Sequence, residues 1–260
     1  MMQTDPYATD EQAALYDFVW GGAGDDLLMY EQFARRGETP SLEIGVGSGR
    51  VALHLARAGL DVVGIDAALP MLARIEASLD PETASHLRLV EADMRDFDLQ
   101  GARFDLVYCA GNTFQHMLTT EDQLAALSCI TRHLAPGGQY VSQVRTPRAI
   151  DWGVERTPVY LRWSRAIPGS GDRMLRFDST TVSAADQTAS TVHLFDRVAP
   201  DGAVTRRIVE YTLRYSSLSE MRLLFERCGL HVAAVYGDAD LSPYTDESDT
   251  MVIVAEGEES

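Results

Sequence analysis

Apolar and polar positions follow two different periods along this chain of 260 residues. From residue 41 to residue 144, short apolar runs alternate with segments whose apolar residues have helical spacing. The predicted strands are 41–44, 62–66, 86–90, 104–109 and 139–143, and the predicted helices are 51–55, 70–79 and 120–134. Strands that alternate with helices in this way form a parallel sheet with helices on both faces, so the pattern predicts an α/β fold.

After Val144 the apolar residues begin to alternate with polar ones, first around residues 159–164 and last around residues 209–215. Two further β-rich stretches, 174–182 and 188–198, lie between them. This pattern predicts an antiparallel meander of three or four strands with one packed and one open face. Because the meander is inserted between the fifth and sixth strands of the sheet, we expect it to cover the substrate crevice or to form a homodimer interface.

The two ends of the chain complete the predicted organisation. A short helix around residues 15–20, a glycine-rich stop and a second helix over 25–36 precede the first strand. A helix over 219–228 and strands over 230–236 and 250–255 return the chain to the sheet after the meander. The domains are predicted as an N-terminal helical lid (1–40), a cofactor-binding core (41–144 and 216–260) and a β insertion (145–215).

The most informative motif lies where the first predicted strand ends. Glu43 is followed by three alternate glycines, Gly45, Gly47 and Gly49, and Asp66 ends the next strand. Glycines let the backbone turn sharply and approach a ligand where a Cβ atom would collide. The motif therefore predicts a cradle for a nucleotide-like ligand. A strand-turn-helix corner that binds no ligand could have the same glycine pattern.

The charges of the motif distinguish between nucleotide ligands. Arg50 stands where the dinucleotide fingerprint has its third glycine, and the carboxylate of Glu43 would repel a pyrophosphate. The same carboxylate could accept hydrogen bonds from an ammonium group, and Asp66 is placed to accept them from two ribose hydroxyls. S-adenosyl-L-methionine fits these charges, because it has an α-amino group, a sulfonium and a ribose diol but no phosphate.

This run of residues and the distal acid resemble the class I S-adenosylmethionine-dependent methyltransferases. The resemblance implies a Rossmann-like seven-stranded sheet whose last strand is antiparallel. It also implies that Asp93 accepts a hydrogen bond from the adenine, that Met94 packs on the ring, and that Ala67 and Ala110 border the cofactor. Met71 is predicted to line the other side of the adenine. Asp93 could instead cap a turn, and Met71 could be a core residue.

Two groups are candidates for catalysis. His116, in the loop after the fourth strand, has a pKa suited to taking a proton from a hydroxyl or an ammonium. It could also simply satisfy a loop carbonyl. Tyr16 and Trp20 are predicted to fold over the cofactor as an aromatic lid, with Tyr16 as the second catalytic candidate, or else to be packing residues.

The segment Asp93 to Phe97, the loop that ends at His116 and the inserted meander are similar to N-methyltransferases of nucleotide-linked amino sugars. Residues 143–147 depart from the sugar enzymes. The resemblance implies methyl transfer to nitrogen or oxygen of a small molecule in secondary metabolism. The alternatives are a non-catalytic S-adenosylmethionine-binding protein and an NAD(P)-dependent oxidoreductase.

Composition narrows the partners. The net charge of −17 disfavours a nucleic-acid partner, because proteins that bind nucleic acids usually present a basic face. The N-terminus lacks the features of a signal peptide and no apolar run is long enough to cross a membrane, so we expect a cytoplasmic protein. The three cysteines are widely spaced, which favours reduced packing residues over a metal site.

Overall fold

The computed structural model describes residues 7, 9–22 and 24–257. Within these residues the chain forms two compact units, residues 7–149 with 216–257 and residues 150–215. In the described part of the chain, none of the helices combines the length and the apolar character needed to cross a bilayer.

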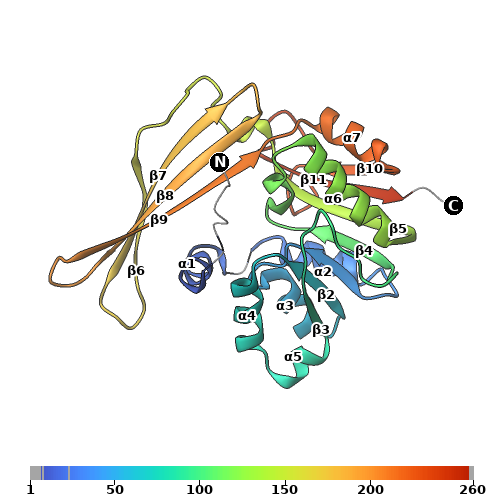
Figure 1. Ribbon diagram of the computed structural model, residues 1–260, viewed down its shortest axis with the longest axis horizontal. Coiled ribbons are helices and arrows are strands. Elements are labelled where there is room, and N and C mark those ends of the chain that lie inside the picture. The colour runs from blue at the N-terminus through green and yellow to red at the C-terminus, as the bar shows by residue number, and fades with distance from the viewer. Residues whose placement is uncertain (1–6, 8, 23, 258–260) are drawn as a thin grey trace. The chain divides into compact units, whose positions relative to one another are not determined.

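The larger unit is built on a seven-stranded sheet in the order β10-β11-β5-β4-β1-β2-β3 (Figure 1). Its strands are β1 (Ser41–Ile44), β2 (Val62–Asp66), β3 (Leu87–Glu91), β4 (Phe104–Cys109), β5 (Leu134–Arg145), β10 (Leu230–Tyr236) and β11 (Thr250–Gly257). Strand β11 is antiparallel to β5 and β10, whereas the pairings among β1 to β5 are parallel. The expected α/β sheet with one inverted strand is confirmed.

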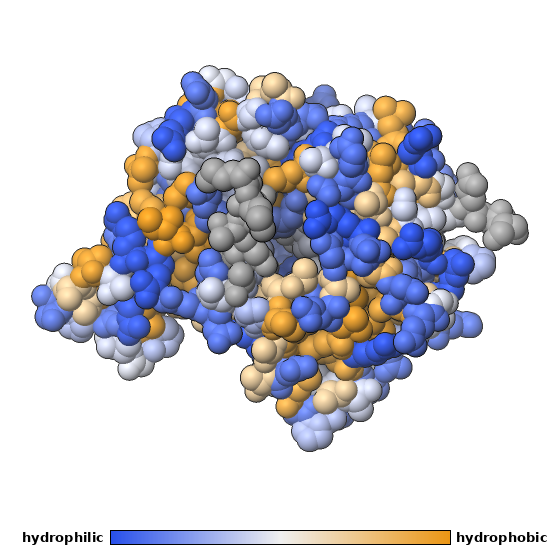
Figure 2. All heavy atoms as spheres, viewed as in Figure 1, coloured by the Kyte–Doolittle hydropathy of each residue, from blue (hydrophilic) through white to orange (hydrophobic). Residues whose placement is uncertain are grey.

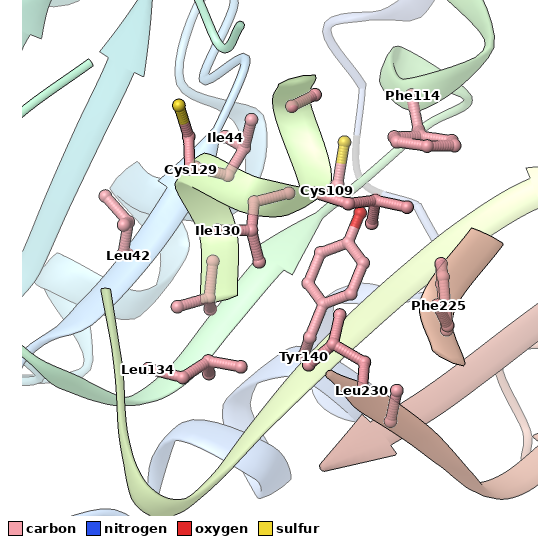
Figure 3. Packing of buried hydrophobic residues seen from close by; sticks show 14 of the residues in the cluster. Leu42, Ile44, Cys109, Phe114, Cys129, Ile130, Leu134, Tyr140, Phe225 and Leu230 are labelled. Atoms are coloured by element: carbon pink, nitrogen blue, oxygen red, sulfur yellow. The ribbon is translucent and has the colours of Figure 1, made fainter. Parts of the chain in front are cut away.

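Helices cover both faces of this sheet. They are α1 (Asp10–Trp20), α2 (Leu27–Ala34), α3 (Arg50–Arg57), α4 (Leu69–Ser78), α5 (Pro81–Ser85), α6 (Thr120–His133) and α7 (Leu218–Arg227), with 3-10 turns η1 (Thr113–His116) and η2 (Pro147–Ala149). Leu42 and Ile44 of β1 pack with α6 and α7, where Ile130 and Phe225 join the same core (Figure 3). Tyr108 of β4 belongs to a second core, formed with α2, α3 and α4.

Two differences from the predicted elements have local causes. Strand β5 starts at Leu134 and not at residue 139, because a register shift against β4 lets residues 135–138 continue the strand. Helix α5 was not predicted, since its five residues are too short to show a helical period. The side chain of Asp80 caps this helix by accepting hydrogen bonds from the amides of Glu82 and Thr83, at 3.0 and 2.9 Å.

The smaller unit contains the predicted meander. It is a four-stranded antiparallel sheet of β6 (Tyr160–Ala166), β7 (Arg173–Ser183), β8 (Thr188–Val198) and β9 (Val204–Arg214) in sequential order. Asp178 is buried in it and accepts hydrogen bonds from Arg176 at 2.7 Å and from His193 at 2.6 Å. Hydrophobic residues are nevertheless exposed along its long strands (Figure 2).

Candidate functional site

The glycine loop between β1 and α3 has the backbone of a ligand cradle. Gly45, Gly47 and Gly49 all have positive φ, at +68°, +55° and +86°. A Cβ atom at Gly45 would lie 2.2 Å from the Cγ2 of Thr113, so a side chain there is excluded by contact as well as by conformation. A Cβ atom at Gly47 would meet nothing within 4 Å, and the backbone there is open to a ligand.

Asp66 lies at the end of β2 beside this loop. Its carboxylate accepts hydrogen bonds from the amide of Gly47 at 2.7 Å and from the amide of Ala68 at 2.8 Å, one on each oxygen. The two amides fix the orientation of the carboxylate, while the side chain keeps partial exposure. A carboxylate is an acceptor for hydroxyl donors, so Asp66 is chemically suited to a diol.

Glu43, the second acid of the motif, is buried, whereas Asp66 is partly exposed. Glu43 is 3% exposed, and the hydroxyl of Tyr108 donates to its Oε2 at 3.0 Å. Burial raises the pKa of this carboxyl to about 8, against the lowering effect of the Tyr108 hydrogen bond and of the nearby Arg50 charge. Arg50 itself is held by both carboxylate oxygens of Asp26, at 2.5 and 2.7 Å.

Helix α1 brings an aromatic group to this acidic cradle. Burial raises the pKa of the Tyr16 hydroxyl; the charge of Arg50 opposes the rise, and those of Glu43 and Asp66 add to it. The ring of Tyr16 lies 5.3 Å from that of Trp20, between ring centroids. Trp20 lies next to Tyr16 with 37% of its surface exposed, and the role of the two rings as a lid over the cofactor stays a prediction.

Packing and charge attach α1 to α4. Ala13 packs with Ala68 and with Met71, which is 2% exposed. Arg74 donates to the carboxylate of Asp17 at 2.5 Å. Met71 is thus a buried residue in the contact between the two helices, and its adenine role stays a prediction.

Asp93 follows β3 and adopts a turn. It accepts hydrogen bonds from the backbone amide of Arg95 at 2.9 Å and from the guanidinium of the same residue at 2.6 Å. The pKa of Asp93 is lowered mainly by the hydrogen bond from Arg95. This turn-capping role is the alternative that the sequence left open. Arg95 makes two contacts with each carboxylate oxygen of Asp93, and the adenine role stays a prediction. The neighbouring Met94 is partly buried against the core.

His116 ends the 3-10 turn η1, directly after β4. The turn is fixed to β5 through Gln115, whose amide oxygen accepts from the backbone amide of Arg145 at 2.9 Å. Ala110 starts the same loop and is 8% exposed. The ring of His116 lies 6.0 Å from that of Tyr7, which in turn lies 5.5 Å from the ring of Tyr16.

The structure thus brings the candidate catalytic residues into one aromatic row, from His116 through Tyr7 to Tyr16. Tyr7, Tyr108 and Gln115 were not predicted from the sequence as site residues. Tyr7 precedes the first helix and shows no periodic pattern, and Tyr108 reads as an ordinary strand residue. No signal in one sequence identifies Gln115. Among the described residues, no group of three or more His, Cys, Asp or Glu side chains is arranged to hold a metal.

The site fits S-adenosylmethionine in shape and sign. The cradle offers open backbone at Gly47, a carboxylate oriented by two amides at Asp66 and a buried carboxyl group at Glu43. The carboxylate of Asp66 would repel a phosphate.

Replacement of Asp66 by Asn is expected to weaken S-adenosylmethionine binding by roughly a hundredfold, because hydrogen bonds to a charged group contribute about 1.5–3 kcal/mol each. Titration calorimetry measures the change. Asp61→Asn is the matched control, since Asp61 lies exposed before β2 and its side chain hydrogen-bonds to His86. Equal affinities of the two variants would contradict the assignment of Asp66.

Comparison with known proteins agrees with this geometry. A family described as "Methyltransferase domain" matches residues 42–138, the stretch that contains the glycine loop, Asp66 and Asp93. The cypemycin N-terminal methyltransferase of a Streptomyces species is 31% identical over 261 residues, covering 97% of this chain and 99% of that protein.

Two further similarities are partial or structural. The glycine/sarcosine N-methyltransferase of Halorhodospira halochloris is 31% identical over 155 residues, which is 58% of this chain and 57% of that protein. The structure of the CcbJ methyltransferase from Streptomyces caelestis superposes with a TM-score of 0.77 at 24% identity, covering 92% of this chain and 98% of that one. The motif, the fold and the full-length similarity lead to one conclusion: the chain belongs to the S-adenosylmethionine-dependent methyltransferases.

Proposed function

We propose that this enzyme transfers a methyl group from S-adenosylmethionine to the amine nitrogen of a small acceptor in secondary metabolism. The observation that carries the proposal is the row of His116, Tyr7 and Tyr16 beside the acidic cradle. The names of two similar proteins support it, because one is an N-terminal methyltransferase and the other a glycine/sarcosine N-methyltransferase.

The cofactor supplies an electrophilic methyl group on a positively charged sulfur. The protein's part is to align the acceptor, exclude water and remove a proton from an acceptor that arrives as an ammonium ion. The imidazole of His116 is the group we assign to that proton, since its pKa range suits an exchange near neutral pH. The hydroxyl of Tyr16, whose pKa is raised by burial, stays protonated and serves to donate a hydrogen bond.

The proposal also gives a role to the N-terminal segment and to the β insertion. The N-terminal segment 1–40 acts as a lid over the cofactor, and the insertion 145–215 recognises the acceptor. The chain enters the insertion from the carboxyl end of β5, and the carboxyl ends of parallel strands are where open α/β sheets bind their ligands.

The function is tested by incubating the protein with labelled S-adenosylmethionine and paired acceptors. Each pair contains an amine (a short peptide with a free N-terminus, glycine, an amino sugar) and its N-acetylated counterpart. Mass spectrometry is expected to show methyl groups on an amine and none on the acetylated partner. Methylation of hydroxyl groups alone would overturn the N-directed proposal, and cofactor binding without any product would indicate a non-catalytic binder.

Replacement of His116 by Asn is expected to lower kcat by about 10²- to 10⁴-fold, the usual contribution of a general base. Binding of S-adenosylmethionine should change less than threefold, because the imidazole is assigned to the acceptor and not to the cofactor. Raising the pH should restore part of the lost rate, as more of the acceptor amine is then neutral. His86→Asn, at an exposed ion pair with Asp61, is the control. Full turnover of the His116 variant across the pH range would remove His116 from the mechanism.

The insertion also has a surface that suits self-association. Leu161, Phe177, Leu194 and Ile208 lie opposite one another in register across all four strands. Leu161 and Ile208, at the two edges, are 52% and 61% exposed. On β9 the charged residues Arg206 and Glu210 flank Ile208 on the same face, and Arg206 also binds Asp196 of β8. A two-fold axis along the row would place Arg206 of one copy opposite Glu210 of the other, so we assign this row to a homodimer interface.

The double replacement Leu161→Arg and Ile208→Arg is therefore expected to convert a dimer into a monomer, as measured by sedimentation equilibrium. Leu223→Arg is the matched control, because Leu223 is 68% exposed on α7 in the other unit. A wild-type protein that is monomeric at micromolar concentration would refute the interface.

Charge and cysteine state support our proposals for partners and cellular location. The net charge of −17 supports the proposal that the protein does not bind nucleic acids. The cysteines are free, as is usual in a reducing compartment such as the cytoplasm, where we place the enzyme.

A further inference from the structure

The cradle contains a buried carboxyl group, that of Glu43, which forms no ion pair among the residues that the structure describes. Glu43 lies on β1 between Leu42 and Ile44, which face the opposite core. Tyr108, directly opposite on β4, donates a neutral hydrogen bond to it at 3.0 Å, and the backbone amide of Ala52 donates a second one. The charge of Arg50 acts on Glu43 without an ion pair, because Asp26 binds both arms of the Arg50 guanidinium.

The groups around Glu43 offer few other protons in the neutral range. Burial raises the pKa of Tyr108 and of Tyr30 on α2 well above 10, so both hydroxyls stay neutral donors. Burial raises the pKa of Cys109, next along β4, to about 12. The pKa of Tyr16 on α1 is also raised. The β2 residue paired with Glu43 is Gly64, which has no side chain.

A buried carboxylate without a cation is costly, and such a group usually stays protonated. S-adenosylmethionine carries two cationic groups, the ammonium and the sulfonium, and the cradle beside Glu43 fits this ligand. An arriving cation favours the ionised carboxyl, and the Tyr108 hydroxyl already points at the oxygen that receives the charge.

We propose that Glu43 is a neutral carboxylic acid in the cofactor-free enzyme, that S-adenosylmethionine binding ionises it with release of the proton to solvent, and that Tyr108 is the positioning residue that permits this ionisation. The charge in the pocket is then balanced in both states. The site favours a cationic ligand over neutral or anionic nucleosides, because only a cation forms an ion pair with the ionised carboxylate of Glu43.

The test is calorimetric titration of the protein with S-adenosylmethionine in buffers of different ionisation enthalpy, which counts the protons released. A pKa of about 8 means that about nine in ten Glu43 side chains are protonated at pH 7, so the wild type should release about 0.9 proton per bound cofactor. The release should fall to near zero by about pH 9.5. Infrared difference spectra should show the band of a protonated carboxyl disappear on binding.

Tyr108→Phe removes the donor and keeps the buried ring. Loss of a hydrogen bond to a charged group should shift the pH window of proton release upward by about one to two units and weaken binding at pH 7 by roughly tenfold to a hundredfold. Tyr30→Phe is the matched control, because its ring lies 4.8 Å from that of Tyr108 while its hydroxyl points to Gln143. This control should leave both quantities unchanged.

Glu43→Gln keeps the shape and cannot ionise, so it should release no proton at pH 7 and lose the infrared band. Three results would overturn the proposal: wild-type binding without proton release at pH 7, undiminished release in the Glu43 variant, or an unshifted pH window in the Tyr108 variant. Absence of any binding heat with the wild type would instead contradict the cofactor assignment, so the two failures are distinguishable.

Discussion

The constraint on which this site depends is the backbone of three residues at the end of β1. Gly45, Gly47 and Gly49 all adopt positive φ, and this conformation turns the chain from the strand into α3 within a few residues. The same turn directs the amide of Gly47 at Asp66. One local conformation therefore starts a helix, orients a carboxylate and leaves backbone exposed to a ligand.

The alternation of strands and helices was readable from the sequence because most of the longer elements have a clear period. Leu42 and Ile44 alternate with Glu43 along β1, and apolar residues alternate with polar ones around residues 159–164 and 209–215 of the insertion. Boundaries were harder to predict, since pairing decides them. Residues 135–138 contain Pro136, Gly137 and Gly138 and read as a turn, yet a bulge against β4 keeps them in the strand.

The site could be predicted from the sequence only where its residues belong to a recognisable motif. The glycines, Glu43 and Asp66 form a motif, so their grouping was expected. Tyr108 lies 65 residues after Glu43, and only the pairing of β1 with β4 makes them neighbours. Tyr7 and Gln115 are of the same kind, because their roles arise from contacts across the fold and not from spacing.

Two carboxylates of similar chemistry acquire different functions here from their surroundings. Asp66 is partly exposed and takes a hydrogen bond from a backbone amide on each oxygen. Glu43 is removed from water and receives a neutral phenol, so its charge must come with a ligand. The first is suited to hydrogen-bonding hydroxyl groups and the second to balancing a cation. A methyl donor that combines a ribose with positive charge satisfies both, which links the choice of cofactor to the burial of one side chain.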